Sequence, residues 1–360
     1  MRLLFAESSV RGYGTEQHIA ALATAMARRG HDVRCVVIAG SPVASLLQEA
    51  RVPMVSMSPG RTRGLRIAAA LLRLVLQQRP DWMISNDPRF YRMLLAARRL
   101  TGARVALFRH WHDAPARQRT RELLSGRADR FILVSSFHRQ DYGRQGMSVE
   151  RASVLYNPID TGRFRPSPAS RASARARLGL GDSDFVVGYV GRIIEAKGIF
   201  TLAAAAGRFL AAEPSARMLW VGDGEDAAML RARVASLPAA DRHRVLGWEA
   251  DVAALYPGLD LLAVPSLYPE PFGRVSVEAQ AAGVPVVSSL AGGLPETFIP
   301  GTTGMGVDPG DADGLASAVL ALMRDPEERR RMGAAGREWA CTRFSLERIA
   351  EDFERLLAGG

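Results

Sequence analysis

The chain contains 47 basic residues, and Lys197 is its only lysine. This lysine lies in the segment Gly191-Arg192-Ile193-Ile194-Glu195-Ala196-Lys197-Gly198, between a strand-like run at 185–190 and a helix-like run at 199–210. A strand, a glycine-bearing turn and a helix N-terminus form a recurrent anion site, because free N–H groups and the helix dipole face the ligand. Arg192 and Lys197 add two mobile cations that can bind a diphosphate. Alternatively, this segment is a solvated turn without a ligand. Lys197 is then simply the one basic position at which this chain, which otherwise uses arginine, has a lysine.

Two glutamates, Glu270 and Glu278, form a second constellation in the segment 265–296. The loop at 270–273 opens a helix, and Glu278 follows about two turns later. The N–H groups of such a loop can contact phosphate oxygens, while Glu278 can accept hydrogen bonds from a ribose diol. Glu270 can hold sugar hydroxyls or balance a developing cation. Each glutamate alone is more simply a helix-start carboxylate or a solvated residue, but their spacing and the trailing Gly-Gly-x-Pro-Glu at 292–296 favour a site.

The first half offers weaker signals. Gly12 and Gly14 follow the first strand-like run and precede a helix, a position at which glycines commonly just make a turn. His110 and His112 follow another strand, but no third ligand cluster accompanies them, so zinc is not expected. The Asp-Ala-Asp at 311–313 is interpreted as a turn and helix start rather than as a metal site.

The elements that would position these residues form two series of alternating strands and helices, which predicts α/β folding with parallel sheets. Ligands of such folds bind at the carboxyl ends of the strands. The expected strands are 3–6, 33–38, 52–55, 82–85, 105–108, 130–134 and 153–156 in the first series, and 186–190, 218–221, 245–247, 261–264 and 284–287 in the second.

The length of 360 residues exceeds what one hydrophobic core usually supports, so two doubly wound domains are expected. A turn-rich composition shift near residue 160 separates the two series. We expect a first domain at 1–165, a linker region at 166–181, a second domain at 182–336 and terminal helices at 337–360 that partly pack on the first domain.

Charge is divided unevenly between the halves. Through Arg165 there are 27 arginines and 12 acidic residues, and the remainder holds 20 basic and 25 acidic residues. This asymmetry predicts that the first half meets something anionic. Nucleic acid is not expected, because no zinc-finger spacing, RNP-like strand or basic tail occurs. The basic amphipathic stretch 61–79 instead favours an anionic membrane surface, with a core helix whose arginines face water as the alternative.

Other features bear on the compartment. No apolar run is long enough to span a bilayer, and the N-terminus is too short and too soon acidic for a signal peptide. Cys35 and Cys341 are the only cysteines, so neither a disulfide framework nor a cysteine metal site is expected. We therefore expect a cytoplasmic protein that can associate peripherally with the inner face of the cell membrane.

Together these motifs resemble the signature of the retaining, nucleotide-sugar-dependent glycosyltransferases of the GT-B fold, family 4. The resemblance rests on Glu270 and Glu278 in a Glu-x7-Glu pattern, the Gly-Arg…Lys-Gly loop at 191–198, Val-Gly-Asp-Gly at 221–224, and Tyr-Asn-Pro-Ile-Asp at 156–160. Pro158 stands where the family usually has glycine. The likeness covers essentially the whole chain and is most specific in the second half. It implies two Rossmann-like domains facing a central cleft, with a C-terminal helix that crosses back to the first domain.

The resemblance also implies roles for the residues of the second half. Gly191, Arg192 and Lys197 would bind the donor diphosphate, and the two cations would stabilise the leaving nucleoside diphosphate. Backbone N–H groups around three residues would contact the sugar or its phosphates, namely Phe272, Gly273 and Val275. Glu270 would hold hydroxyls of the donor sugar and Glu278 those of the ribose.

In the first half, the family places a glycine-rich loop near the donor at Gly12 and Gly14, which Tyr13 separates here. It also places a histidine near the donor sugar; His110 is narrowly favoured over His112. No cofactor and no metal are implied beyond the nucleotide-diphosphate sugar itself.

The implied activity is transfer of a sugar to an envelope polysaccharide, lipopolysaccharide or glycolipid acceptor. Alternatives are a sugar-nucleotide epimerase or a phosphorylase of the same fold, or a non-catalytic module that binds a nucleotide or a membrane. The Arg-Lys and Glu-x7-Glu combination disfavours the epimerase, and the sole lysine leaves no second one for a phosphorylase cofactor.

Overall fold

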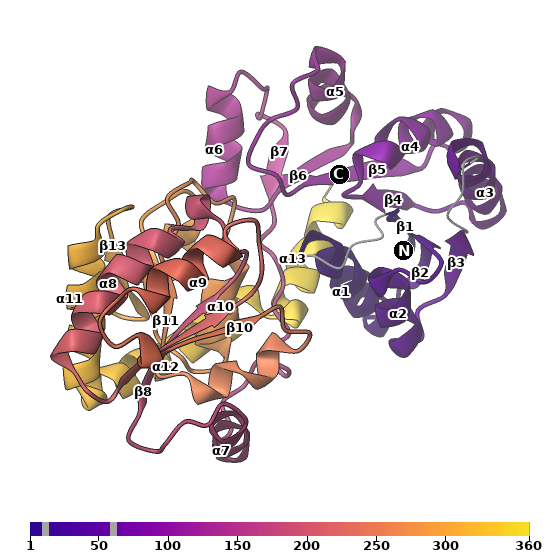
Figure 1. The fold of residues 1–360 in the computed structure, drawn as a ribbon. Coiled ribbons are helices and arrows are strands. Elements are labelled where there is room, and N and C mark those ends of the chain that lie inside the picture. The colour runs from indigo at the N-terminus through magenta and orange to yellow at the C-terminus, as the bar shows by residue number, and fades with distance from the viewer. Residues whose placement is uncertain (9–13, 58–62, 360) are drawn as a thin grey trace. The chain divides into compact units, whose positions relative to one another are not determined.

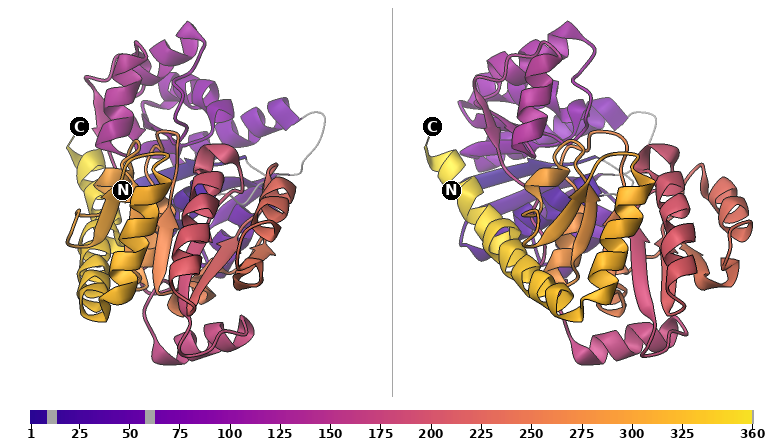
Figure 2. Two further views of the ribbon diagram at one scale, coloured as in Figure 1. Left: turned by 60° about the vertical axis from the view of Figure 1, so that its left-hand side comes forward. Right: turned by 90° about the vertical axis from the view of Figure 1, so that its left-hand side faces the viewer.

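The structure is a computed structural model, and it describes residues 1–8, 14–57 and 63–359. The chain divides into two compact units (Figure 1). One unit consists of Met1–Pro158 together with Leu346–Gly360, and the other of Ile159–Ser345. Each unit is a parallel sheet with helices on both faces (Figures 1 and 2), as expected for two doubly wound α/β domains.

The first unit contains a seven-stranded sheet in the order β3-β2-β1-β4-β5-β6-β7, and every pair is parallel. Its strands are β1 (Arg2–Ala6), β2 (Asp32–Ile38), β3 (Met54–Met57), β4 (Trp82–Ser85), β5 (Arg104–Arg109), β6 (Arg130–Leu133) and β7 (Ala152–Val154). Its helices are α1 (Gly14–Arg28), α2 (Pro42–Glu49), α3 (Arg63–Gln78), α4 (Pro88–Thr101), α5 (Gln118–Glu122) continued by a π-helix at Leu123–Arg127, α6 (Ser136–Arg144) and α13 (Leu346–Ala358).

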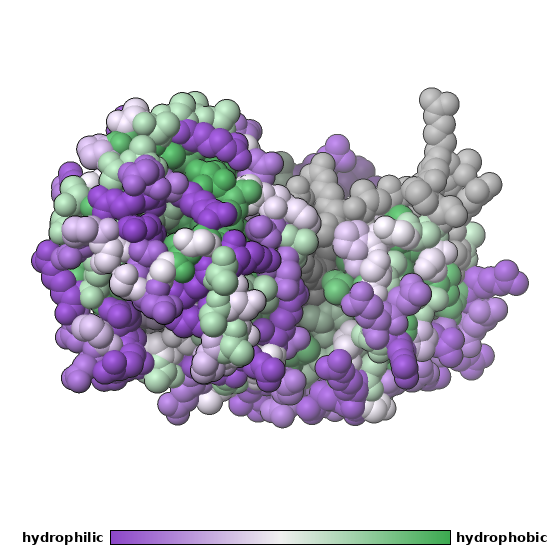
Figure 3. Space-filling view, turned by 60° about the horizontal axis from the view of Figure 1, so that its bottom comes forward, coloured by the Kyte–Doolittle hydropathy of each residue, from purple (hydrophilic) through white to green (hydrophobic). Residues whose placement is uncertain are grey.

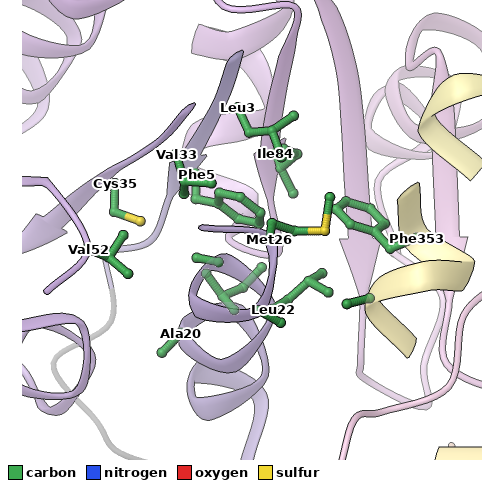
Figure 4. Close-up of a cluster of buried hydrophobic side chains, with 14 of the residues drawn as sticks. Leu3, Phe5, Ala20, Leu22, Met26, Val33, Cys35, Val52, Ile84 and Phe353 are labelled. Carbon is green, nitrogen blue, oxygen red and sulfur yellow. The ribbon is translucent and has the colours of Figure 1, made fainter. Parts of the chain in front are cut away.

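Alternation along β1 divides the core of the first unit into two layers. Leu3 and Phe5 point to the layer that contains α1, α2 and α13, whereas Leu4 and Ala6 point to the layer that contains α3 and α4. In the first layer Phe353 of α13 lies 6.5 Å from Phe5 and beside Met26 (Figure 4). The final helix therefore returns to the first unit, which confirms the expected crossing.

The second unit contains a six-stranded parallel sheet in the order β10-β9-β8-β11-β12-β13. Its strands are β8 (Phe185–Val190), β9 (Ala216–Val221), β10 (His243–Gly247), β11 (Leu261–Val264), β12 (Val286–Ser289) and β13 (Gly304–Val307). Its α-helices are α7 (Pro168–Arg177), α8 (Ile199–Ala212), α9 (Ala227–Ala235), α10 (Arg274–Ala281), α11 (Ala312–Arg324) and α12 (Pro326–Phe344), with short 3-10 turns at Glu195–Lys197, Ala240–Arg242, Val252–Ala254, Tyr256–Gly258 and Leu294–Glu296.

The expected linker region at 166–181 is instead part of the second unit. Its helix α7 is fixed there by the buried guanidinium of Arg175, which donates to the carbonyls of Gly258, Gly181 and Asp184 and pairs with Asp260. The unit boundaries accordingly lie at 158/159 and 345/346. The first eight residues of the expected terminal segment 337–360 complete α12 in the second unit, and only α13 joins the first.

The strand orders locate two topological switch points. In the first unit the order reverses between β1 and β4, and in the second unit between β8 and β11. Ligands of open parallel sheets bind outside the carboxyl ends of the strands at such points, because the connecting loops diverge there. A ligand-binding site is therefore expected at the loops that follow β1, β4, β8 and β11.

No helix in the described part of the chain is both long and apolar enough to span a lipid bilayer. The face drawn in Figure 3 is mainly hydrophilic, with hydrophobic residues in smaller patches.

Candidate functional site

The loop that follows β8 packs directly on the loop that follows β9. Gly191 N donates to Val221 O over 3.0 Å, and Ile193 N donates to Asp223 O over 3.0 Å. A Cβ on Gly222 would lie 1.8 Å from Gly191 O, so only glycine permits this approach of two backbones. The Gly-Arg and Val-Gly-Asp-Gly motifs, which are 30 residues apart in the chain, are thus two halves of one backbone arrangement.

The same loop also packs on the loop that follows β11. A Cβ on Gly198 would lie 1.8 Å from Pro265 O, and Leu267 N donates to Ala196 O over 3.0 Å. Gly198 has φ +71° and forms the N-cap of α8. The 3-10 turn at Glu195–Lys197 therefore lies directly against the loop of the neighbouring strand, at the switch point of this sheet.

Lys197 and Glu270 meet across this switch point. Lys197 Nζ lies 2.7 Å from Glu270 Oε2, and the two side chains are 18% and 11% exposed. The hydroxyl of Ser266 donates to the other carboxylate oxygen of Glu270. Gly293 N donates to Glu270 O over 2.7 Å, which fixes the backbone of the glutamate to the loop that follows β12. An ammonium has three donors, so its pairing with one carboxylate leaves donors for a ligand anion.

Arg192 adds a second positive charge to this region. Its side chain is exposed, and its carbonyl accepts a 2.5 Å hydrogen bond from the hydroxyl of Tyr189. Lys197 Nζ lies 5.1 Å from the centre of the Tyr268 ring. Burial and the charge of Glu270 raise the pKa of Tyr268, whereas the charges of Lys197 and Arg192 lower it. Both cations therefore act on the same side chain.

Glu278 has partners of its own on α10. Its carboxylate accepts hydrogen bonds from the hydroxyl of Tyr256 over 3.1 Å and from the guanidinium of Arg274 over 3.2 Å, and the residue is buried. Burial, followed by the charge of Glu278, raises the pKa of Tyr256 far above its usual value. The glutamate is thus fixed in one orientation with both oxygens engaged, and its expected contact with a ribose stays a prediction.

The start of α10 holds the three residues predicted to offer backbone N–H groups. Phe272 is buried and its ring packs edge-to-face on Phe344 at 5.5 Å, so its side chain belongs to the core. Gly273 is the N-cap of α10, and Val275 lies half-buried in the first turn. N–H groups in the first turn of a helix have no partner within that helix. The expected contact of these N–H groups with a sugar or phosphate stays a prediction.

In the first unit, His110 lies at the carboxyl end of β5 and is buried. Its ring stacks at 6.0 Å on Phe108 and meets the ring of His18 edge-on at 4.7 Å. His18 Nδ1 lies 2.9 Å from the side-chain oxygen of Asn157. The Tyr-Asn-Pro-Ile-Asp motif therefore contributes an asparagine that fixes His18, and His18 in turn supports His110.

His112 has a different environment from His110. Its Nδ1 lies 3.5 Å from Asp141 Oδ2 of α6, and its carbonyl accepts a hydrogen bond from Gln145. Of the two glycines of the first loop, Gly14 is the first residue of α1, and Gly12 lies outside the described residues. The roles that the resemblance implies for these residues stay predictions.

Two serines of these clusters, Ser8 and Ser266, were missed by sequence reasoning. At the switch point of the first unit, Asp87 accepts hydrogen bonds from the backbone N–H of Ser8 over 3.1 Å and from the Ser8 hydroxyl, and it caps α4. Ser266 and Ser8 share one signal that could have revealed them, since each is a polar residue within two positions of the end of a buried strand. Asp311 caps α11 by accepting from Gly314 N, in agreement with the helix-start interpretation.

Comparison with known proteins gives the family. A model described as "Glycosyl transferases group 1" matches residues 170–339, and one described as "Glycosyltransferase Family 4" matches residues 13–163. A GDP-mannose-dependent alpha-(1-6)-phosphatidylinositol monomannoside mannosyltransferase of Mycobacterium tuberculosis is 32% identical over 326 residues, which cover 86% of this chain and 83% of that protein. The chain belongs to the group 1 glycosyltransferases of the GT-B fold.

Two further relatives of this group 1 glycosyltransferase are informative. A D-inositol 3-phosphate glycosyltransferase of Segniliparus rotundus is 37% identical over 223 residues, and the match spans 59% of this chain and about half, 48%, of that protein. The crystal structure of HepE from Anabaena in complex with UDP-glucose has a TM-score of 0.86 and 25% identity and covers both chains completely.

Proposed function

We propose that this group 1 glycosyltransferase transfers a sugar from a nucleoside-diphosphate sugar to a hydroxyl of an envelope polysaccharide, lipopolysaccharide or glycolipid, with retention of the anomeric configuration and without a metal. The observation that carries the proposal is the 2.7 Å pair of Lys197 and Glu270 at the switch point of the second unit. A cation and a carboxylate held side by side suit a donor with an anionic half and a hydroxyl-bearing half.

In this reaction the bond between the anomeric carbon and the diphosphate breaks, and a bond from that carbon to the acceptor oxygen forms. The proton of the acceptor hydroxyl passes to a phosphate oxygen of the departing diphosphate, so no base of the protein is consumed. The chief demand is to neutralise the charge that develops on those oxygens. Lys197 and Arg192 supply two cations for this purpose, and Lys197 is held in place before any ligand binds by Glu270.

Glu270 has the complementary role. Its carboxylate is oriented by Ser266 and Lys197 and is almost completely buried, so it accepts sugar hydroxyls at a defined position. Its negative charge also favours positive charge on the anomeric carbon. Delivery of the acceptor to the face from which the diphosphate departs gives retention. Because two side-chain cations already serve the diphosphate, the reaction needs no metal ion.

The proposed acceptor is membrane-linked, and we place the protein at the cytoplasmic face of the membrane. The support lies in α3, where Leu71, Leu74 and Val75 are buried in the core while Leu72 and Leu76 remain exposed beside arginine. Exposed leucines between arginines suit a surface with anionic headgroups and an apolar interior. Flotation with phosphatidylglycerol vesicles tests this assignment, because Leu76→Asp should weaken binding.

The transfer reaction is tested by incubating the protein with a panel of sugar nucleotides and envelope acceptors in the presence of EDTA, with the anomeric configuration of donor and product read by NMR. Retention in EDTA is the expected result. Inversion, or activity that requires added metal, would contradict the corresponding part of the proposal. Epimerised sugar nucleotide without transfer would favour an epimerase, and nucleotide binding without any turnover would favour a non-catalytic module.

A further inference from the structure

Arginines make up half of the residues that line a hollow of about 950 Å³ in the first unit. It lies between α4, α5, the π-helix at Leu123–Arg127 and the start of β6. Figure 1 labels α4, α5 and β6. Seven arginines and two carboxylates, those of Glu122 and Asp129, make up its charged lining. So uneven a lining is unfavourable without an anion, because like charges repel one another at short range.

The two sides of the hollow contribute arginines from different elements. Arg92 and Arg99 lie seven residues apart on α4, which places them two turns apart on one face of the helix. Arg119 of α5 and Arg127 of the π-helix line it from the other side, and Arg151 precedes β7. Within the part of the chain that the structure describes, no hydrogen bond or ion pair engages these five guanidinium groups. Their donors are available to a ligand.

Two further arginines form a fixed part of the wall. Arg98 binds Asp129 through two hydrogen bonds of 2.6 and 2.8 Å, and Arg130 donates to Leu356 O of α13 and to Asp129 O. Asp129 also accepts from Val105 N over 2.8 Å. The half-buried carboxylate of Asp129 is thus committed to its neighbours and does not neutralise the five uncommitted arginines.

The hollow is separate from the polar cluster at the switch point of the same sheet. Asp129 and Arg130 lie at the amino end of β6, and Arg151 lies at the amino end of β7. Ser8 and His110 follow the carboxyl ends of β1 and β5, at the opposite edge of the sheet. A ligand in the hollow would therefore bind independently of a donor sugar at the strand carboxyl ends.

We infer that this hollow binds a molecule that carries two or more phosphate groups. Guanidinium groups match phosphate oxygens with paired, charge-assisted hydrogen bonds, and they approach the hollow from both sides. Five uncommitted guanidinium groups offer more donors than one phosphate can accept, and the volume exceeds that of a single phosphate. The same chemistry occurs in a soluble polyphosphate and in a lipid headgroup with two phosphates. This inference does not depend on the proposed transfer reaction.

The test is calorimetric titration of the 360-residue chain with inorganic triphosphate. The same titration is made with a double variant of the hollow, Arg99→Gln with Arg127→Gln. The matched control is Arg28→Gln with Arg144→Gln, which removes the same charge from exposed positions of the same unit. All four side chains are exposed, so the variants should fold. The hollow variant should lose affinity by roughly tenfold or more, because several charge-assisted hydrogen bonds disappear, while the control should bind as the native protein does.

Lys197→Ala should retain this binding, which separates the hollow from the cations of the second unit. A second arm measures binding to phosphatidylcholine vesicles with and without cardiolipin, a lipid with two phosphates. If the hollow variant loses both triphosphate and cardiolipin binding, the ligand of the hollow is a lipid headgroup. If it loses triphosphate binding alone, the ligand is a soluble polyphosphate. Equal triphosphate affinity in the hollow variant and the control would overturn the inference.

Discussion

Lys197 Nζ lies 2.7 Å from Glu270 Oε2, although the two residues follow different strands, β8 and β11. The order of the sheet reverses between these neighbouring strands, and the loops that carry the pair pack against each other there. The pair holds both side chains in a fixed orientation. A diphosphate that binds here meets a cation that is already ordered, which lowers the entropic cost of binding.

Glu270→Gln should separate the charge of this residue from its shape. The amide can still accept from Ser266, but it no longer carries a charge opposite Lys197. Because the pair is mostly buried, loss of the charge leaves the Lys197 ammonium without its partner, and we expect a stability loss of about 3 kcal/mol. Turnover should fall by roughly 10²-fold, because preorganised charge at a reacting centre is lost. Release of nucleoside diphosphate and thermal unfolding measure the two effects.

The control for Glu270→Gln is Glu195→Gln, an exposed carboxylate in the loop that contains Lys197. This control should leave both the turnover and the stability of the protein unchanged. A Glu270→Gln protein with native turnover would show that the charge of this glutamate has no part in the reaction.

Gly198→Ala should disrupt the site through its backbone. The added Cβ would lie 1.8 Å from Pro265 O, so the loops that follow β8 and β11 would have to separate. Gly301 has the same φ of +71° with nothing within 4 Å of its Cβ position, which makes Gly301→Ala a matched control for backbone strain. We expect a stability loss of about 1–2 kcal/mol for the control and more than about 4 kcal/mol for Gly198→Ala. Denaturant unfolding measures both, and equal losses would refute the steric account.

Arg175→Leu should destabilise the second unit. The guanidinium is buried and satisfies three carbonyls and Asp260, all of which would lose a donor. Removal of one partner from a buried ionic cluster costs about 3–5 kcal/mol. Arg177→Leu, an exposed arginine at the end of the same helix, serves as the control and should change stability little. Denaturant unfolding of both proteins gives the comparison, and similar stabilities would contradict a structural role for Arg175.

The first unit should lose stability in mild acid through His138. Burial lowers the pKa of His138 to about 4, and its Nε2 lies 2.8 Å from Trp111 O, so the neutral ring is the folded form. The folded pKa lies below the unfolded value, so the unfolded state binds more protons as the pH falls. The contribution is therefore complete above about pH 6.5 and is lost towards pH 4, with a total of about 3 kcal/mol.

His138→Phe removes this titration, and Tyr142 still donates to Trp111 O. The melting temperature of the native protein should fall more between about pH 7.5 and about pH 5 than that of the variant. His243 of the second unit, whose pKa burial also lowers to about 4, keeps titrating in both proteins. An equal acid-induced fall in the two proteins would exclude His138 as the cause.

Strongly patterned elements could be predicted from the sequence, whereas weakly patterned ones could not. The strand predicted at 261–264 is β11 itself, because a short apolar run between turn residues is typical of a buried parallel strand. Strand β13 was missed, because its sequence Gly-Met-Gly-Val lacks a hydrophobic run. Its place is set by packing, since a Cβ on Gly304 would lie 2.6 Å from a side-chain carbon of Val286. Helix α6 was missed because only His138 and Tyr142 of its nine residues are buried.

The site was predicted as a set of residues but not as a set of contacts. Lys197 was assigned to the diphosphate of the donor and Glu270 to its sugar, and the direct pairing of the two side chains follows only from the adjacency of β8 and β11. The Arg274–Glu278 pair was visible in principle as an i,i+4 pair on a helix. The support of His110 by His18, and of His18 by Asn157, joins positions that are far apart in the chain. Such contacts depend on tertiary packing, which periodicity does not encode.

The proposed reaction requires Lys197 to bind the donor diphosphate. The most direct measurement is a thermal-shift titration of the native protein, Lys197→Ala and the exposed-cation control Arg231→Ala with nucleoside diphosphates such as UDP and GDP. A ligand that binds the folded state raises its melting temperature by mass action. We predict that at least one nucleotide stabilises the native protein and Arg231→Ala, and that this stabilisation disappears in a folded Lys197→Ala. Equal stabilisation of all three proteins, or of none of them by any nucleotide, would show that Lys197 does not bind the diphosphate.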